Sequence, residues 1–255
     1  MRAYDVLGNI ALLKFRKNEK LDDKKKKALK LLKENPSIKT VLEKTDKFKG
    51  RLRTLKTNYL AGERTKEILY KENGCIFRFN VEKSYFSSRL SNERLEIARK
   101  VQKNERVLVL FGGVAPYAII IAKVAKPNKI VSIELSRESS KYALENVKRN
   151  KVNVEIVQGD VRRVLPKIKE KFDRIIMARP NLKDSFLDIV FPKIKKFGII
   201  HYYGFYNEDD KEELKLLIER EVKKAGKKIK IIKVKKAGDI GPYKFRYRAD
   251  VKVLN

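Results

Sequence analysis

The second half of the chain alternates short apolar runs with amphipathic segments. In the segment 137–150 the apolar residues Tyr142, Ala143 and Val147 recur at helical spacing. Two more helices are predicted, one near residues 183–194 and one opened by Asn207. Strands that alternate with helices predict a parallel sheet. The predicted strands are VLVLF at 107–111, IVSIE at 130–134, VEIVQ at 154–158, DRIIMA at 173–178 and GIIHYY at 198–203.

The C-terminal segment has a different pattern. Residues 227–236 and 243–253 are two extended runs joined by AGDIGP, and the second run alternates strictly between apolar and polar positions. This pattern predicts an antiparallel hairpin with one buried face. Five parallel strands followed by such a hairpin are typical of the α/β, Rossmann-like sheet of class I methyltransferases. A dehydrogenase sheet would normally continue in parallel.

Charge is the strongest global signal. The chain has 63 Lys and Arg residues against 32 Asp and Glu residues, a net charge of +31. Such an excess attracts polyanions, nucleic acids above all. The alternatives are a lysine-rich composition typical of a hot or AT-rich source and, more weakly, an anionic membrane surface. Basic residues recur in the predicted strands between Lys47 and Arg64. The sheet face that carries them is expected to lie against phosphates; the alternative is a sheet face that is merely solvated.

The first 85 residues have the pattern of a small α+β domain. Two short strands flank Gly8-Asn9, a basic helix follows at 22–34, and Asn35-Pro36 ends it. In the segment that follows residue 85, Ser91 is the expected N-cap of a helix. Further strands are predicted at 39–44, 48–62 and 76–81. The expected division is a small RNA- or substrate-binding domain over 1–85, a connecting segment and helix over 86–104, and a cofactor-binding domain over 105–255.

Cysteine and histidine are scarce. The one cysteine, Cys75, excludes an internal disulfide and agrees with a reducing, cytoplasmic setting. One cysteine and one histidine exclude a structural zinc site built from these residue types, and no metal is expected. The N-terminus lacks the design of a signal peptide. The apolar run 107–122 is too short to cross a bilayer and is broken by glycines and Pro116, so no membrane association is expected.

Three predicted strands end in residues suited to a nucleoside. Gly112-Gly113 follows the first strand, Glu134 ends the second, and Asp160 follows the third. The carboxyl ends of parallel strands meet at one edge of a sheet, where such folds bind ligands. Glycines let the backbone approach an amino acid moiety, Glu134 can accept from both ribose hydroxyls, and Asp160 from the exocyclic amine of adenine. This set favours S-adenosylmethionine over a dinucleotide, because no third glycine prepares a pyrophosphate site.

Several segments together are more specific than the strand ends alone. They are YFSSRLSNER at 85–94, FGGVAPYAI at 111–119, IEL, GDVR and IIHYYGF, with YDVLGNIALLKF, KTVLEK and ENGCIFRF in the front part. The chain resembles the archaeal and eukaryotic tRNA (guanine-37 N1)-methyltransferase family, which includes the wyosine-pathway transferases. The resemblance runs from about residue 4 to the end, without the small N-terminal domain that many members use on the outer corner of the tRNA. It implies S-adenosylmethionine as cofactor and the tRNA anticodon loop, at position 37, as substrate; a monomer is expected.

The resemblance also implies residue roles. Glu93 matches the general base that takes the guanine ring proton, and Arg53 matches a basic residue that steadies charge on the guanine carbonyl oxygen. The target base would be splayed out of its stack, with Tyr85, Tyr203 and Tyr206 as stacking candidates, although core packing is the commoner role for any one of them. The implied cofactor contacts are Arg94, Phe111, Gly112, Gly113, Glu134, Leu135, Asp160, Val161 and Ala178, and the implied substrate contacts are Tyr85, Arg89, Arg179 and Pro180.

The chain departs from the family pattern at two places. The family motif D-x-F-A-G-x-G has an acid and a second glycine where this chain has Val109 and Ala115, and N-L-P is replaced by the run Met177 to Pro180. Three functions therefore stay open. The first is methylation of guanosine 37, with possible bifunctional methylation of a tricyclic wyosine precursor. The second is aminocarboxypropyl transfer from the same cofactor, and the third is a basic RNA-binding protein whose cofactor site has decayed.

Overall fold

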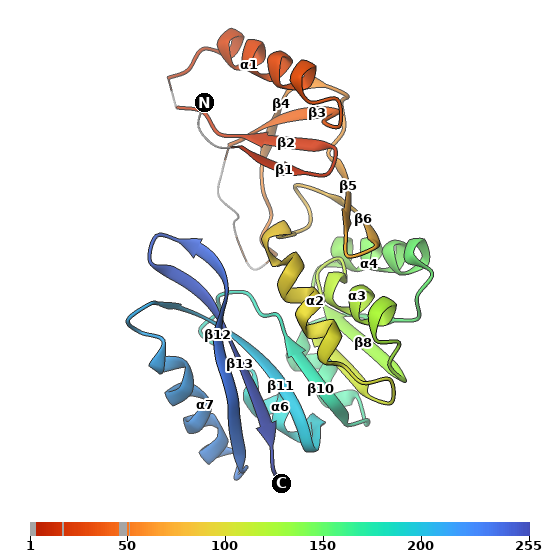
Figure 1. Ribbon diagram of the computed structural model, residues 1–255, viewed down its shortest axis with the longest axis vertical. Coiled ribbons are helices and arrows are strands. Elements are labelled where there is room, and N and C mark those ends of the chain that lie inside the picture. The colour runs from red at the N-terminus through yellow and green to blue at the C-terminus, as the bar shows by residue number, and fades with distance from the viewer. Residues whose placement is uncertain (1–3, 17, 46–49, 51) are drawn as a thin grey trace.

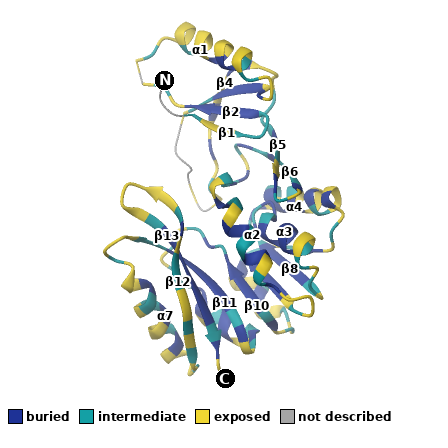
Figure 2. Ribbon diagram, viewed as in Figure 1, coloured by how far each residue is buried: buried dark blue, intermediate teal, exposed yellow. Residues whose placement is uncertain are grey.

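The computed structural model describes residues 4–16, 18–45, 50 and 52–255. In the front part a four-stranded sheet, in the order β1-β2-β3-β4, is covered on one side by α1 (Figure 1). Helix α1 buries Ala28 and Leu31 against Val41 and Leu60 and turns its lysines to solvent (Figure 2). These elements are β1 (Asp5–Leu7), β2 (Ile10–Leu13), α1 (Leu21–Glu34), β3 (Thr40–Lys44) and β4 (Thr57–Gly62).

A two-stranded ribbon, β5 (Glu67–Glu72) and β6 (Cys75–Asn80), follows and packs on helix α4 (Arg137–Asn150). The side-chain amide of Asn150 both donates to and accepts from the backbone of Ile76, at 2.7 and 2.8 Å, and Asn146 does the same at Arg78. These amides satisfy an edge that a third strand would otherwise pair. The ribbon is thereby fixed to the following part of the chain.

The main sheet has seven strands in the order β12-β13-β11-β10-β7-β8-β9. The five strands from β11 to β9 are parallel, and β13 pairs antiparallel with both β11 and β12. The predicted fold class is therefore confirmed, including the C-terminal hairpin. The strands are β7 (Arg106–Leu110), β8 (Lys129–Glu134), β9 (Glu155–Gln158), β10 (Phe172–Met177), β11 (Ile194–Asn207), β12 (Ile229–Gly241) and β13 (Lys244–Val253).

Helices cover both faces of this sheet. Val107 and Val109 of β7 pack with α2 (Ser91–Lys100), α3 (Pro116–Val124) and α4, while Leu108 and Leu110 face α6 (Leu187–Val190) and α7 (Glu212–Lys224). Alternate burial on both faces explains why the central strands read as unbroken apolar runs. Among the described residues no helix is long and apolar enough to cross a membrane. The remaining helical segments are η1 (Ser88–Leu90), α5 (Val161–Val164), η2 (Leu165–Lys167) and η3 (Phe191–Lys193).

Four predicted local features differ from the structure. Ser91 is the first residue of α2 rather than its cap, because η1 runs directly into the helix. Asn207 opens no helix, since it still pairs with Lys244 at the end of β11. The helix expected at 183–194 is only the four residues of α6 followed by η3, where Pro192 has no N–H to donate. Strand β5 was not predicted separately, and the predicted strand at 48–62 forms only as β4, with residues 48, 49 and 51 outside the described residues.

Candidate functional site

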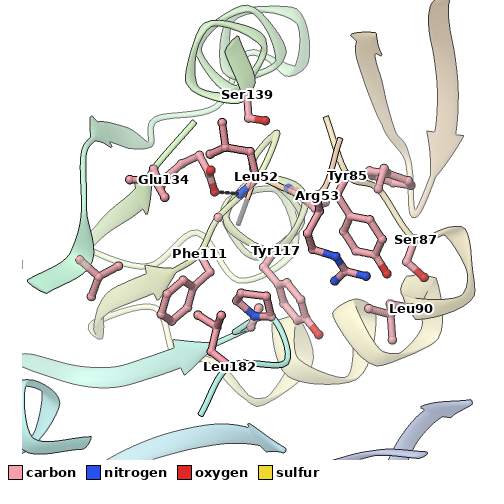
Figure 3. A pocket seen from close by; sticks show the side chains of 18 of the residues that line it. Leu52, Arg53, Tyr85, Ser87, Leu90, Phe111, Tyr117, Glu134, Ser139 and Leu182 are labelled. Carbon is pink, nitrogen blue, oxygen red and sulfur yellow. Dashed lines mark hydrogen bonds between the residues drawn. The ribbon is translucent and has the colours of Figure 1, made fainter. Parts of the chain in front are cut away.

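A pocket lies at the carboxyl ends of the parallel strands, facing the front part of the chain. Figure 3 shows Glu134 and Phe111 on one side of it and Arg53 and Tyr85 on the other. The strand-end residues and the front-part residues predicted from sequence thus meet in one place. Of the predicted site residues, the lining includes Arg53, Tyr85, Arg94, Phe111, Gly112, Gly113, Glu134, Leu135, Asp160, Val161, Ala178 and Pro180.

The glycine turn after β7 is closely packed. A Cβ on Gly112 would lie 2.2 Å from Oγ of Ser132, so a larger residue would fit only if that hydroxyl group shifted. Gly113 has φ +58, and its N–H donates to Oε2 of Glu134 at 2.7 Å (Figure 3). The N–H of Ser136 donates to the other carboxylate oxygen at 2.8 Å. Each oxygen keeps a lone pair for an incoming hydroxyl group, so Glu134 is held ready to accept from a diol.

Burial raises the pKa of Glu134, against the effect of the backbone N–H groups of Ser136 and Gly113. Next to it the pocket is lined by the apolar side chains of Leu135, Val161 and Ala178. Asp160 lies at the same edge and caps α5 by accepting from the N–H of Arg162 at 2.9 Å. A slot with apolar walls and one carboxylate at its rim suits a planar, amine-bearing ring.

The two departures from the family's glycine motif, at Val109 in β7 and at Ala115 before α3, have different consequences. Ala115 has φ +66, the left-handed conformation that glycine adopts without strain, so the backbone keeps its turn despite the missing glycine. Val109, where the family has an acid, is fully buried among apolar neighbours of α2 and α3. The apolar core takes this position, and the carboxylates at the pocket are supplied by Glu134 and Asp160.

Arg53 reaches the pocket from the front part of the chain. Its guanidinium carbon lies 3.4 Å from the centre of the Tyr85 ring, a close cation–π contact. Burial lowers the pKa of Arg53, and the charge of Arg246 acts in the same direction. A cation and an aromatic ring therefore share the side of the pocket opposite Glu134.

Glu93, the predicted general base, does not line the pocket. It is 6% exposed, and its Oε1 accepts from the hydroxyl of Tyr203 at 2.6 Å and from the guanidinium of Arg248. Tyr203 in turn accepts from the hydroxyl of Tyr117 at 3.1 Å, and Tyr117 does line the pocket. A chain of hydrogen bonds thus leads from the pocket to Glu93. Tyr203 is fully buried, which agrees with core packing, the commoner role, rather than with stacking on a base.

The predicted arginines occupy different positions. Arg94 lines the pocket, but its guanidinium forms two 2.6 Å hydrogen bonds to Glu72 and so ties α2 to β5. Arg89 is exposed and lies 3.4 Å from Asp5. Arg179 lines neither this pocket nor the second one; its buried guanidinium donates to the carbonyls of Leu182 and Asp184 and shapes the loop after β10.

A second pocket adjoins the first, between the front part and the β12–β13 hairpin. The two pockets share Arg53, Tyr85, Phe86, Ser87, Leu90 and Arg246, and the second adds Lys44, Arg89 and Asp239 among others. The sequence does not reveal Arg246 as a site residue, because strict alternation in β13 predicts one buried and one solvated face. In the structure α2 and the pockets cover that second face, so residues 246–251 are all buried. The described residues contain no group of acidic, histidine or cysteine side chains that could hold a metal ion.

Comparisons with known proteins agree with this geometry. Residues 68–235 match the model of the TRM5/TYW2 methyltransferase domain, and residues 1–65 match that of the TYW2 N-terminal domain. The chain is 32% identical to the tRNA (guanine(37)-N(1))/4-demethylwyosine(37)-methyltransferase Taw22 of Nanoarchaeum equitans, over 99% of this chain and 100% of the relative.

Two further relatives bear on fold and activity. The crystal structure of Trm5b from Pyrococcus abyssi superposes with a TM-score of 0.87 at 32% identity, covering 100% of this chain and 76% of that one. The tRNA(Phe) (4-demethylwyosine(37)-C(7)) aminocarboxypropyltransferase of Methanocaldococcus jannaschii is also 32% identical, over 78% of this chain and 77% of the relative. These matches confirm the resemblance seen in the sequence. The chain belongs to the TRM5/TYW2 methyltransferase domain family.

Proposed function

We propose that this protein is an S-adenosylmethionine-dependent tRNA methyltransferase that acts on N1 of guanosine 37. Membership of the family supports the broader part of this function, S-adenosylmethionine-dependent modification of tRNA. The observation that carries the finer part is the arrangement of the two pockets. A nucleoside site around Glu134 shares Arg53 and Tyr85 with a second pocket that can admit a base.

The residues at the strand ends fit S-adenosylmethionine. Glu134, held by two backbone N–H groups, would accept from the ribose hydroxyls, and Asp160 would accept from the adenine amine. The close approach at Gly112 leaves the backbone bare where the amino acid part would lie. When bound, this cofactor supplies an electrophilic methyl group. An intact cradle of this kind argues against a decayed cofactor site.

The protein's own part in the reaction is to hold the base and remove its proton. Arg53 would stabilise negative charge on the guanine carbonyl oxygen, and Tyr85 would stack beside the base. The N1 proton would pass to the hydroxyl oxygen of Tyr117, whose own proton passes to Tyr203 and from there to Oε1 of Glu93. The hydroxyl group of Tyr117 already donates to Tyr203, and that of Tyr203 already donates to Glu93. Burial raises the pKa of both tyrosines, so each gives up its proton only as it receives one.

Two related activities remain alternatives at the same site. Methylation of the tricyclic precursor 4-demethylwyosine is favoured by the bifunctional relative from Nanoarchaeum equitans, and aminocarboxypropyl transfer by the relative from Methanocaldococcus jannaschii. The run Met177 to Pro180, where the family has N-L-P, departs from the family pattern, and its residues Ala178 and Pro180 line the pocket.

Nucleoside mass analysis separates these activities. Unmodified tRNA and tRNA carrying 4-demethylwyosine are each incubated with protein and S-adenosylmethionine, digested and analysed. The proposal predicts a guanosine heavier by one methyl group from the first substrate. A nucleoside heavier by an aminocarboxypropyl group, from the second substrate alone, would assign the alternative activity. No cofactor binding in calorimetry at millimolar concentration would exclude both.

A further inference from the structure

Two arginines on the same face of β13 have opposite surroundings. Arg248 is fully buried and is paired with Glu93, Glu96 and Asp250. Arg246, two residues earlier, is also buried, at 5% exposure, yet within the described chain it forms no ion pair and no hydrogen bond with an acid. The Nε atoms of both arginines are buried without a hydrogen-bond partner, but that of Arg248 lies 2.7 Å from a carboxylate oxygen of Asp250. The guanidinium of Arg246 instead lies 5.0 Å from the ring of Phe205.

An arginine stays charged when it is buried, because its guanidinium is not deprotonated in proteins. Removing such a charge from water without a compensating anion is strongly unfavourable. The charge of Arg248 is compensated by three carboxylates, two from α2 and one from β13. Arg246 has no such compensation, so its position is explained best by an anion that arrives from outside the chain.

The position of Arg246 indicates where that anion would lie. Arg246 lines both pockets, together with Arg53, and its charge contributes to the lowered pKa of Arg53 after the larger effect of burial. The acids of the second pocket do not neutralise it: Asp5 faces Arg89, and Asp239 forms no ion pair with Arg246. Two guanidinium groups thus lie where the two pockets meet, next to the apolar surfaces of Phe86 and Leu90.

We propose that Arg246, with Arg53, forms a binding site for an anionic oxygen group at the junction of the two pockets. Both a carboxylate and a phosphodiester have the paired oxygens that a guanidinium recognises. The carboxylate would be that of the methionine part of the cofactor, and the phosphodiester would be one flanking the target nucleoside of the RNA. The proposed function supplies only these two candidate sources; the binding of an anion does not require group transfer.

The test compares Arg246→Met and Arg246→Lys with wild-type protein, and uses Arg220→Met, at an exposed position on α7, as the matched control. Calorimetry measures binding of S-adenosylmethionine and of 5′-methylthioadenosine, which lacks the carboxylate. Filter binding measures tRNA affinity across a range of salt concentrations. Thermal melting of the ligand-free variants shows whether they fold.

If the carboxylate is the ligand, Arg246→Met weakens S-adenosylmethionine binding by roughly tenfold or more and leaves 5′-methylthioadenosine unchanged. If the phosphodiester is the ligand, tRNA affinity falls and the slope of log affinity against log salt becomes shallower by about one. Either result supports the site. Unchanged binding of all three ligands by Arg246→Met overturns it.

Folding of the variants provides a second criterion. Removal of an uncompensated buried charge should leave the ligand-free melting temperature unchanged or raise it, whereas loss of a structural arginine would lower it. If Arg246→Met does not fold, Arg246→Lys decides: weaker binding of S-adenosylmethionine or tRNA supports the site, and wild-type binding of every ligand overturns it. If wild-type protein binds the anion but transfers no group to tRNA, the proposed function is wrong and the anion site is still supported.

Discussion

The hydroxyl of Tyr203 donates a 2.6 Å hydrogen bond to Oε1 of Glu93, joining β11 to α2 across 110 positions of the sequence. Both side chains are buried, and neither lines the pocket. The carboxylate predicted to be the general base is therefore connected to the pocket only through the hydroxyl groups of Tyr203 and Tyr117. Arg248 forms an ion pair with Glu93, and Tyr117 donates to Tyr203 from the pocket side.

Glu93→Gln should lower turnover by a factor on the order of 10² to 10⁴, the range of a lost general base. Affinities for cofactor and tRNA should stay close to wild type, because Glu93 does not line either pocket. Single-turnover methylation, with separate binding measurements, checks this prediction. Glu96→Gln is the control, since Glu96 shares Arg248 but not Tyr203. Unchanged turnover in Glu93→Gln would show that Glu93 is not the base.

Tyr117→Phe and Tyr203→Phe should each slow the transfer step while leaving cofactor affinity intact, because each removes one hydroxyl of the proton path. The solvent isotope effect on the transfer step, measured across mixtures of light and heavy water, should indicate more than one proton in wild type. Tyr202→Phe is the matched control: Tyr202 is adjacent and buried, and its hydroxyl has no hydrogen-bond partner in the described structure. If Tyr117→Phe transferred as fast as this control, Glu93 would have to reach the base directly.

Ala115→Gly should stabilise the protein. Ala115 has φ +66, where a side chain costs about 1–2 kcal/mol, and glycine loses part of that gain through the entropy of the unfolded chain. The expected net gain is about 0.5–1 kcal/mol in urea unfolding. Ala118→Gly, at a buried position in the first turn of α3, should instead lose about 1 kcal/mol. A destabilised Ala115→Gly would mean that the turn is not strained.

Acid should destabilise the contact between α2 and β13. Burial acts in the opposite direction, yet hydrogen bonds from Lys235 and Arg248 lower the pKa of Glu96 from 4.5 to about 2. A lowered carboxyl pKa contributes stability that is complete above the unfolded value and is lost as pH falls toward the folded value. Stability should therefore decline between pH 4.5 and about 2. In Glu96→Gln the decline over this window should be shallower; an identical pH profile would show that the group contributes nothing.

Much of the fold could be predicted because buried segments have a recognisable pattern of apolar residues in the local sequence. The central strands are buried on both faces and read as apolar runs, and the turn that follows β7 has Gly113 at φ +58, a conformation that glycine adopts without strain. Local signals failed where a long-range contact determined the outcome. Asn207 looks like a helix cap, but it continues a strand because Lys244, far along the chain, pairs with it.

The site was predictable at the strand ends and less so on the far side. Glu134 and Asp160 follow strands, so their meeting at one edge follows from topology alone. Arg246 and Arg248 lie in an alternating strand whose polar face looked solvated, and only the packing of α2 against β13 buries it. The engagement of Arg94 with Glu72 likewise depends on a ribbon, β5–β6, that the sequence did not fully reveal.

The central claim is methylation of guanosine at position 37, and a pair of tRNA transcripts tests it most directly. One transcript carries guanosine 37 and the other adenosine 37, and each is incubated with S-adenosylmethionine before nucleoside analysis. The account predicts 1-methylguanosine from the first transcript only, and none from the first when Glu93→Gln replaces wild type in a single-turnover time. Methylation of the adenosine 37 transcript at the same rate, or no methylguanosine from either, would contradict it.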